Sequence, residues 1–258
     1  MPIDNPLQTT AIFNAMAVPL RSSINQLTIL DCIDSTNTWL MNNGDCYDIC
    51  LAEQQSAGRG RGDNQWISPT GENIYLSLRW CFNDLSHPVT RLSLHIGLLV
   101  ADVLAKWGVS QHGVKWPNDI YWQGKKLAGI LIEHVYKQDH FIIGLGLNVN
   151  MLSNNDKIGQ PWCSLRQILG QPIDRNLFLG DLLSHLIQGL QQFPTISATI
   201  WQTHWQRWDL LASKSIHLQY LDKTYQGIVC GVDAQGQLLL MVDNKLHAFL
   251  SADIYVTW

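Results

Sequence analysis

The chain has 258 residues, of which 46% are hydrophobic and 15% are charged, and its formal net charge is −4. A chain of this length can bury a sizeable core, so we expect one large domain or one large and one small domain. The slightly acidic balance argues against a general attraction to nucleic acid or anionic membranes, and no apolar run is long enough to span a bilayer.

Six cysteines are scattered along the chain, and the first ten residues lack the basic and apolar regions of a signal peptide. We therefore expect reduced thiols in a cytoplasmic protein. Cys46 and Cys50 are four positions apart, but no matching cysteine or histidine pair follows them, which argues against a zinc site.

The first elements alternate between strand and helix. Residues 1–25 have few charges and no strong period, so we expect an arm with one short helix. After the arm we expect a strand, a short helix and two more strands, at residues 27–34, 35–43, 49–55 and 73–82.

The middle of the chain predicts more helix and more strand. Apolar residues at helical spacing predict a helix over residues 91–108 that stops at Gly108. Residues 114–136 predict two strands joined by a turn at QGKK, and further elements are a strand at 140–150 and helices within 165–193. This mixture favours an α+β domain on a mixed, largely antiparallel sheet.

The composition changes near Ser213. From there, short apolar stretches alternate with the turn signals DK, DAQG and DN, which predicts a small all-β barrel. We expect three parts: an N-terminal arm (1–25), a catalytic or ligand-binding domain (26–212) and the barrel (213–258).

A loop rich in glycine and arginine, EQQSAGRGRGDNQW, runs from Glu53 to Trp66. Holding its residues in place costs roughly 1–2 kcal/mol each in backbone entropy, so the empty loop should be mobile. Arg59 and Arg61 can form paired hydrogen bonds with phosphate or carboxylate oxygens, and the glycines let backbone N–H groups approach the same oxygens. The pattern favours a clamp for a phosphate-bearing ligand, with a solvated surface loop as the alternative.

Lys115 lies between two bulky apolar residues at the end of an expected strand, and Pro117 then turns the chain. A lysine on such a short, rigid element can present a fixed positive charge to a developing anion. The alternative is a lysine whose stem lies along an aromatic surface while its head reaches solvent. Asn118 and Asp119 fit turn and cap roles better than catalytic ones.

Two further motifs carry small or polar residues. DSTN, at residues 34–37, lies at a strand-to-helix junction, where its side chains can bind a polar ligand or cap the helix. In GLGLNVN, Gly144, Gly146 and Asn148 alternate along a strand and therefore share one face. The missing side chains allow another backbone or a flat ligand to approach that face.

The motifs DSTN, EQQSAGRGR, VKWPND, KLAGILIE and GLGLNVN occur in this order, with Trp66 beyond the second of them. Together they resemble the motifs of biotin protein ligases, enzymes that attach biotin to acyl-carrier-like domains. The resemblance covers the chain from about Leu27 to its C-terminus. It implies a class II synthetase-like α+β catalytic domain followed by a small SH3-like β-barrel.

The resemblance implies a reaction in two steps. The biotin carboxylate attacks the α-phosphate of ATP, which gives biotinyl-5′-AMP and pyrophosphate, and a lysine of a carrier protein then attacks this mixed anhydride. ATP and biotin are the implied substrates, and Mg²⁺ is implied as the companion of ATP. The glycine-arginine loop would close over the adenylate and protect it from water.

The resemblance also assigns residues to the site, with Lys115 and Arg61 as the catalytic ones and no residue identified as a metal ligand. Biotin contacts are implied for Ser35, Thr36, Asn37, Gln54, Arg59, Gly60, Arg61, Lys115, Gly129 and Leu131. ATP or adenylate contacts are implied for Arg59, Arg61, Trp66, Lys115, Gly144, Gly146, Asn148 and Arg175.

The chain departs from the family pattern in two places. Gly62 and Asp63 stand where many members have Arg-Gly, so the loop has less positive charge with which to retain an adenylate. Members that repress transcription have an N-terminal winged helix-turn-helix, whereas 26 residues precede Leu27, and an independent domain needs at least about 50. We therefore expect no specific DNA binding.

Two alternatives remain: a lipoate or octanoate ligase or transferase, and a non-catalytic biotin-binding regulator. The implied partner is the biotin carboxyl carrier protein of acetyl-CoA carboxylase, bound transiently. We expect no membrane association and leave a homodimer open.

Overall fold

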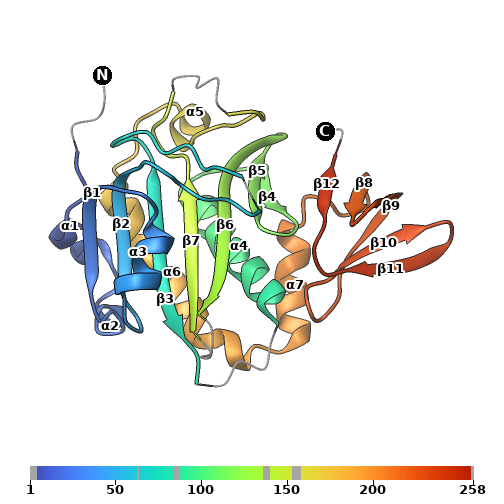
Figure 1. Cartoon of the computed structure of the whole chain (residues 1–258), viewed down its shortest axis with the longest axis horizontal. Coiled ribbons are helices and arrows are strands. Elements are labelled where there is room, and N and C mark those ends of the chain that lie inside the picture. Colours follow the sequence, from blue (N-terminus) through green and yellow to red (C-terminus); the bar gives the residue numbers. More distant parts are fainter. Residues whose placement is uncertain (1–4, 63, 84–87, 136–139, 153–157, 257–258) are drawn as a thin grey trace.

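The computed structural model describes residues 5–62, 64–83, 88–135, 140–152 and 158–256. The main sheet has seven strands: β1 (Leu27–Ile33), β2 (Ile49–Gln55), β3 (Ile74–Cys81), β4 (His112–Lys115), β5 (Asp119–Trp122), β6 (Lys125–Val135) and β7 (His140–Leu147). Their order is β1-β2-β3-β7-β6-β5-β4 (Figure 1). Only β1 and β2 are parallel, and the other neighbours are antiparallel, so the expectation of a mixed, largely antiparallel sheet is confirmed.

The prediction of two strands between residues 114 and 136 was wrong in one respect, because the structure has three. The chain turns at residues 116–118, and Lys115 pairs with Asp119 across that turn. Pro117 has no N–H to donate to a sheet ladder, so a strand does not continue through it. The turn leaves Lys115 at the very end of β4.

Helices cover both faces of the main sheet. They are α1 (Thr9–Ala15), α2 (Val18–Arg21), α3 (Thr36–Asn43), α4 (Val89–Lys106), α5 (Leu165–Leu169), α6 (Arg175–Gln192), the 3₁₀ helix η1 (Phe193–Thr195) and α7 (Ala198–Trp208). In Figure 1, α3 lies in front of the sheet, and α4 and α6 lie behind it. Gly108 follows α4 with φ +89°, the left-handed conformation expected at a helix C-terminus. None of these helices combines the length and apolar character that a membrane span requires.

The N-terminal segment packs on α6 through α1. At Gly180 of α6, an added Cβ would overlap Ala15, so the absent side chain allows the two helices to approach closely. We expected one short helix in this arm, and its described residues form two, α1 and α2.

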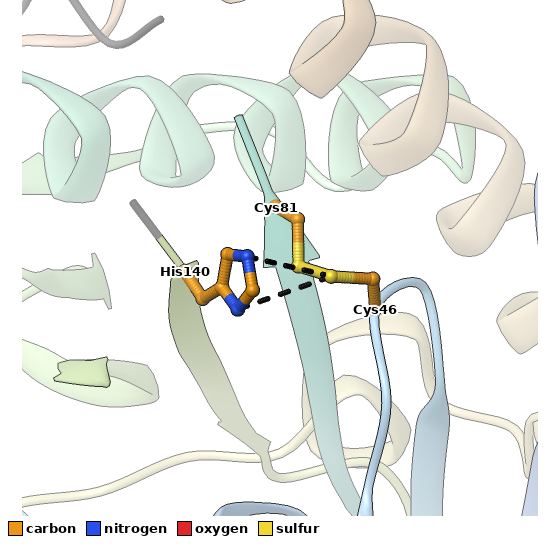
Figure 2. Close-up of side chains that lie close together, drawn as sticks. All are labelled: Cys46, Cys81 and His140. Carbon is orange, nitrogen blue, oxygen red and sulfur yellow. Dashed lines mark hydrogen bonds between the residues drawn. A yellow bond between two sulfur atoms is a disulfide. The ribbon is translucent and has the colours of Figure 1, made fainter. Parts of the chain in front are cut away.

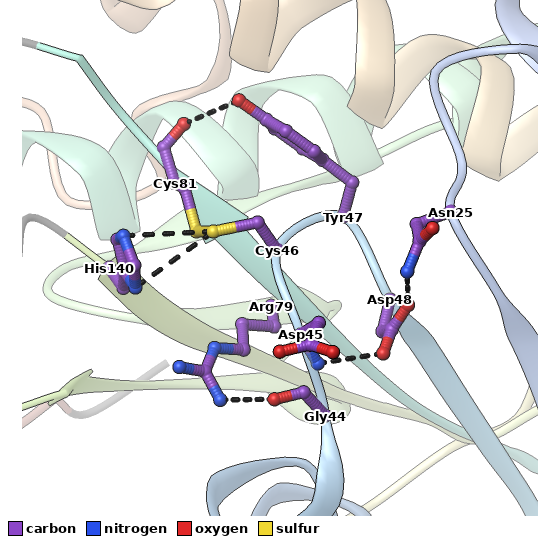
Figure 3. The surroundings of a disulfide bond; sticks show 9 residues. All are labelled: Asn25, Gly44, Asp45, Cys46, Tyr47, Asp48, Arg79, Cys81 and His140. Carbon is purple, nitrogen blue, oxygen red and sulfur yellow. Dashed lines mark hydrogen bonds between the residues drawn. A yellow bond between two sulfur atoms is a disulfide. The ribbon is translucent and has the colours of Figure 1, made fainter.

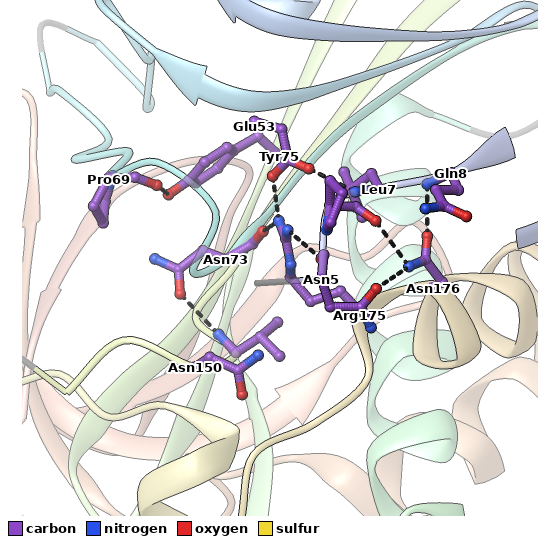
Figure 4. A network of polar contacts seen from close by, with 12 residues as sticks. Asn5, Leu7, Gln8, Glu53, Pro69, Asn73, Tyr75, Asn150, Arg175 and Asn176 are labelled. Carbon is purple, nitrogen blue, oxygen red and sulfur yellow. Dashed lines mark hydrogen bonds and ion pairs between the residues drawn. The ribbon is translucent and has the colours of Figure 1, made fainter. Parts of the chain in front are cut away.

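A buried ion pair joins this arm to the main sheet (Figure 4). Arg175, at the start of α6, is 3% exposed, and its Nη1 lies 2.7 Å from Glu53 Oε2 of β2. The other carboxylate oxygen of Glu53 accepts a hydrogen bond from Leu7 N, and Arg175 also donates to the carbonyls of Asn5 and Asn73. In this structure Arg175, which was expected near the adenylate, binds Glu53 and the N-terminal arm.

A second sheet follows the helices. Its strands are β8 (Ser215–Tyr220), β9 (Lys223–Val232), β10 (Leu238–Val242), β11 (Lys245–Phe249) and β12 (Asp253–Tyr255), and their order is β11-β10-β9-β8-β12. All neighbours are antiparallel. The expected barrel is not confirmed, because β11 and β12 form two edges in the described residues. The sheet contacts the main domain where Trp116 Nε1 donates to Gly236 O at 2.9 Å.

Two cysteines form a disulfide, Cys46–Cys81, although we expected thiols (Figures 2 and 3). The fold brings Cys46, in the loop before β2, to the end of β3, 35 residues further along the chain. No spacing rule links such distant positions, so the sequence did not indicate the pair. Cys32, Cys50, Cys163 and Cys230 are free cysteines.

Candidate active site

A cavity of about 540 Å³ lies on the face of the main sheet that carries α3, where Asn37 of α3 packs against Gly144 of β7. Its floor comes from β3, β6 and β7, and its walls come from the start of α3, the glycine-arginine loop, the end of β4 and the start of β12. The sequence-predicted residues that line it are Ser35, Thr36, Asn37, Arg59, Gly60, Arg61, Trp66, Lys115, Gly129, Leu131, Gly144, Gly146 and Asn148. Gln54 and Arg175 are not in the lining.

The start of α3 forms a buried polar cluster at one end of the cavity. Thr36 N donates to Gln55 Oε1 at 2.9 Å, and Ser77 Oγ lies 2.7 Å from Thr36 Oγ1 and 2.6 Å from Asn37 Oδ1. Asn37 Nδ2 donates to Glu133 Oε2 at 2.9 Å. Because Thr36 and Asn37 each form more than one hydrogen bond, their side chains are held in a fixed orientation at the cavity.

The capping alternative for this motif is not borne out at Ser35. It is the N-cap residue of α3, yet its side chain makes no capping hydrogen bond. Ser35 as a whole is only 3% exposed, and it lines the cavity. Ser35, Thr36 and Asn37 therefore line the cavity, whereas the Asp34 carboxylate accepts a hydrogen bond from Ser35 N.

The two glycines of β7 allow side chains to lie directly on the sheet. A Cβ at Gly144 would overlap Asn37 Oδ1, and a Cβ at Gly146 would overlap the indole of Trp66. The same indole would lie 3.1 Å from a Cβ at Gly129 of β6. The sequence analysis predicted that another backbone or a flat ligand would lie close to this face. In the structure, the side chains of Asn37 and Trp66 lie there. Trp66 therefore covers part of the cavity floor.

The glycine-arginine loop folds back on itself in the structure. Gly60 N donates to Asn64 O at 2.7 Å, and Trp66 N donates to Gly58 O at 2.9 Å. Gly62 has φ +59°, a conformation that glycine adopts without strain. Asp63, which with Gly62 forms the departure from the family pattern in this loop, lies outside the described residues.

The two arginines of this loop point to different elements. Arg59 pairs with Glu133 of β6, with Nη2 and Oε1 2.6 Å apart. Arg61 reaches Asn118 Oδ1 at 3.3 Å and donates to Ser251 Oγ at 2.6 Å. Arg61 therefore connects the loop to the turn after β4 and to the segment that leads into β12.

Lys115 is fixed at the wall of the cavity. Its Nζ donates to Ile254 O at 3.1 Å and lies 5.0 Å from the centre of the Tyr121 ring. Burial lowers the pKa of Lys115, and the carboxylate of Asp119 partly offsets this shift. Lys115 lines the cavity and is bound to a backbone carbonyl. These contacts favour the interpretation of Lys115 as a fixed positive charge over that of a lysine whose head extends into solvent.

The cavity contains further polar residues that the sequence analysis missed. Gln55 lines the cavity, whereas its neighbour Gln54 does not. The side chain of Gln55 points to the cavity because it accepts a hydrogen bond from Thr36 N. Lys126 adds a cation that is paired with Asp119, and Asp253 of β12 adds a carboxylate. Strand alternation could have separated Gln54 from Gln55, whereas only the fold brings residue 253 to this wall.

Asn148 has a structural role at the cavity edge. The residue is 5% exposed, and its Nδ2 donates to Cys163 O at 3.0 Å. It thereby holds the segment before α5 beside the end of β7. A direct ligand contact was implied for Asn148, and its amide already has this partner in the chain.

Comparison with known proteins gives consistent matches. Residues 29–150 match the sequence profile of the Biotin/lipoate A/B protein ligase family. The bifunctional ligase/repressor BirA of Salmonella typhimurium is 37% identical over 235 residues, which cover 88% of this chain and 73% of that protein. The biotin--[acetyl-CoA-carboxylase] ligase of Mycobacterium tuberculosis is 30% identical over 213 residues, with coverages of 80% and 77%.

The biotin protein ligase from Aquifex aeolicus, solved in complex with biotin and ATP, superposes with a TM-score of 0.81 at 26% identity. The match covers 91% of this chain and all of that one. The mixed sheet, the cavity between α3 and the second sheet, and these likenesses define a ligase of the biotin and lipoate class. The chain belongs to the Biotin/lipoate A/B protein ligase family, as one of its biotin protein ligases.

Proposed function

We propose that the protein attaches biotin to a lysine of a biotin carboxyl carrier protein, through a biotinyl-5′-AMP intermediate. The observation that carries this proposal is the layout of the cavity. The uncharged polar side chains of Thr36, Asn37 and Gln55 line it near β3 and β7, and its fixed cation lies on β4. Three strand spacings separate β7 from β4, or about 14 Å. An elongated ligand with a neutral polar head and an acidic tail fits this layout.

Biotin has such a shape, with a ureido head and a carboxylate tail. Thr36, Asn37 and Gln55 offer hydroxyl and amide groups to the ureido donors and carbonyl. Leu131 and the indole of Trp66 provide apolar surface along the ligand. The carboxylate then lies toward Lys115.

In the first step, the biotin carboxylate attacks the α-phosphate of ATP and pyrophosphate leaves. Negative charge grows on the phosphoryl oxygens in the transition state, and Lys115 supplies a fixed counter-charge. Arg61 adds a second cation on the side of the loop. In the second step, the amine of the carrier lysine attacks the acyl carbon and AMP leaves.

Mg²⁺ accompanies ATP in this proposal. It favours oxygen ligands and is held through substrate phosphates with one or two carboxylates. Asp253 fits that requirement, because it is exposed and lines the cavity, whereas Asp119 already pairs with Lys126. Bound there, the ion would neutralise charge on the phosphates.

The second sheet takes part in this site. Ser251 Oγ accepts a hydrogen bond from Arg61, and Ile254 O accepts one from Lys115. Both proposed catalytic residues are therefore held by the same segment of the chain. We propose that residues 213–258 support the catalytic residues of the main domain, 26–212, in both steps.

Arg61→Ala is expected to release biotinyl-5′-AMP into solution. The closed loop loses a charge-assisted contact of about 1.5–3 kcal/mol, so its open form gains about ten- to a hundredfold in population. The free adenylate would acylate exposed lysines of other proteins, measured as labelled biotin on added albumin. Arg207→Ala, an exposed arginine outside the cavity, is the control. Equal albumin labelling by Arg61→Ala and the wild type would contradict the role of Arg61.

Gly144→Ala is expected to weaken biotin binding about ten- to a hundredfold. The added methyl overlaps Asn37 Oδ1, and overpacking of this kind costs about 1–3 kcal/mol. Calorimetry with biotin measures the change. Gly159→Ala is the matched control, because this cavity glycine has no heavy atom within 4 Å of an added Cβ. A Gly144→Ala protein with wild-type affinity would mean that Asn37 does not shape the biotin site.

The proposed function is tested with purified protein, ATP, labelled biotin and an isolated carrier domain. We expect one biotin per carrier domain on a single lysine, found by mass spectrometry. Lipoate and octanoate, offered in place of biotin, distinguish the acyl-ligase alternative. Binding of biotin with no transfer to any carrier would instead favour a regulator.

We propose that the carrier is that of acetyl-CoA carboxylase, by analogy with the Mycobacterium tuberculosis relative, and that it binds transiently. We also propose that the chain acts in the cytoplasm without specific DNA binding.

A further inference from the structure

Three metal-ligating side chains meet at the end of the main sheet that lies away from the cavity. Cys46 belongs to the loop before β2, Cys81 is the last residue of β3, and His140 is the first residue of β7 (Figure 2). Cys81 and His140 are direct partners in the β3–β7 ladder. One ligand atom from each residue lies within 4.8 Å of the other two. Among the described residues, no other group of three or more His, Cys, Asp or Glu is arranged to hold a metal ion.

The loop that carries Cys46 is held by contacts independent of the sulfur–sulfur bond (Figure 3). Tyr47 N donates to Arg79 O at 2.7 Å, and Tyr47 Oη donates to Cys81 O at 3.1 Å. Arg79 donates to Gly44 O, and Asp48 accepts from the backbone of the same loop. Cys46 therefore stays beside β3 and β7 when the disulfide is opened.

The spacing of these groups matches tetrahedral zinc. Zn–S bonds of about 2.3 Å and Zn–N bonds of about 2.0–2.1 Å place sulfur and nitrogen about 3.5 Å apart around a tetrahedral ion. Cys46 Sγ lies 3.6 Å from His140 Nε2 and 3.9 Å from Nδ1. For the ion to enter, the two sulfurs must separate to about 3.8 Å, and one ring nitrogen of His140 must lie about 3.5 Å from both of them.

We propose that, when the Cys46–Cys81 disulfide is reduced, Cys46, Cys81 and His140 bind one Zn²⁺ with water as the fourth ligand. A dithiol reductant supplies two electrons and two protons, the S–S bond breaks to two thiols, and the reductant becomes a disulfide. Zn²⁺ then displaces both thiol protons, which go to solvent, and takes a lone pair from the neutral imidazole. Oxidation and metal binding exclude each other, because both use the same sulfurs.

The remaining cysteines do not offer such a site. Burial raises the pKa values of Cys50 and Cys163 to about 12, which disfavours their thiolates. Cys32 and Cys230 are exposed, and neither belongs to a metal-ligand group in the described chain. The sequence argument against zinc considered Cys46 with Cys50, whereas the fold pairs Cys46 with Cys81 and His140.

The test uses the full-length protein, reduced with dithiothreitol, desalted without oxygen and mixed with Zn²⁺ alone. We expect one zinc per chain after gel filtration, and a rise of about 5–10 °C in the unfolding midpoint at a hundredfold excess over Kd. The same protein with its disulfide intact is the first control, since it has no substitution and should bind no zinc at this site.

Variants locate the ion. Cys46→Ser and Cys81→Ser should lose the bound zinc, and His140→Asn should weaken binding because it removes one of the three protein ligands. Cys32→Ser and Cys230→Ser should bind as the reduced wild type does. Zinc binding that is equal in oxidised and reduced protein, or unchanged in Cys46→Ser, would overturn the proposal, as would a reduced wild-type protein that binds none.

Discussion

Lys115→Ala is expected to slow the formation of biotinyl-5′-AMP by about 10²–10³-fold while biotin affinity changes little. Its ammonium matters most where charge develops on the phosphoryl group, and loss of one such donor typically has an effect of this size. The polar cluster that would hold the biotin head lies across the sheet, at Thr36 and Asn37, and is left intact.

Single-turnover kinetics with labelled ATP measures the adenylation step, and calorimetry measures biotin affinity. The matched control is Lys125→Ala, since Lys125 is exposed and outside the cavity lining. A Lys115→Ala protein that bound biotin poorly but formed adenylate at the wild-type rate would refute the role given to Lys115.

Arg175→Ala is expected to lower the free energy of unfolding by about 3–5 kcal/mol. The change leaves Glu53 as a buried carboxylate without its ionic partner, and uncompensated buried charge is costly. It also removes the donor to Asn5 O, so the N-terminal arm should loosen from α6. A loss of this size is a large part of a typical domain's stability.

Urea unfolding followed by fluorescence measures the difference. Lys106→Ala is the control, because the Lys106 side chain is 58% exposed in its pair with Asp181, and such pairs contribute about 0–1 kcal/mol. Equal losses in the two variants would mean that the Glu53–Arg175 pair does not fix the arm.

The central elements of the fold could be predicted because their signals are local. β3 has a composition rich in strand-favouring residues, and it is buried on both faces in the middle of the sheet. α4 has a long helical period and a glycine beyond its end. The turn at Pro117 was recognised, but the short strands on either side of it were merged, because four residues carry too little pattern.

What the sequence did not indicate depends on long-range contact. Arg175 was expected at the adenylate, yet its partner Glu53 is 122 residues away and only the fold brings them together. Gln54 was expected to line the site, but Gln55 lines it instead and accepts a hydrogen bond from Thr36 N. The sequence of the second sheet predicts short strands and turns. These local signals do not determine whether the two edge strands pair and close the sheet into a barrel.

The motifs that combined several signals are the ones whose residues line the cavity. The arginines, Lys115 and the two glycines of β7 all line one cavity. Lys126 and Asp253 were missed, because a lone charged residue on a strand has no distinguishing pattern, and Asp253 comes from the second sheet.

The most direct test of the central claim is ATP–pyrophosphate exchange with the purified protein. The proposed chemistry predicts that label moves from pyrophosphate into ATP only when biotin is present, and that lipoate and octanoate do not replace biotin. Exchange that is absent with biotin, or equally fast with lipoate, would contradict the assignment of this cavity to biotin activation.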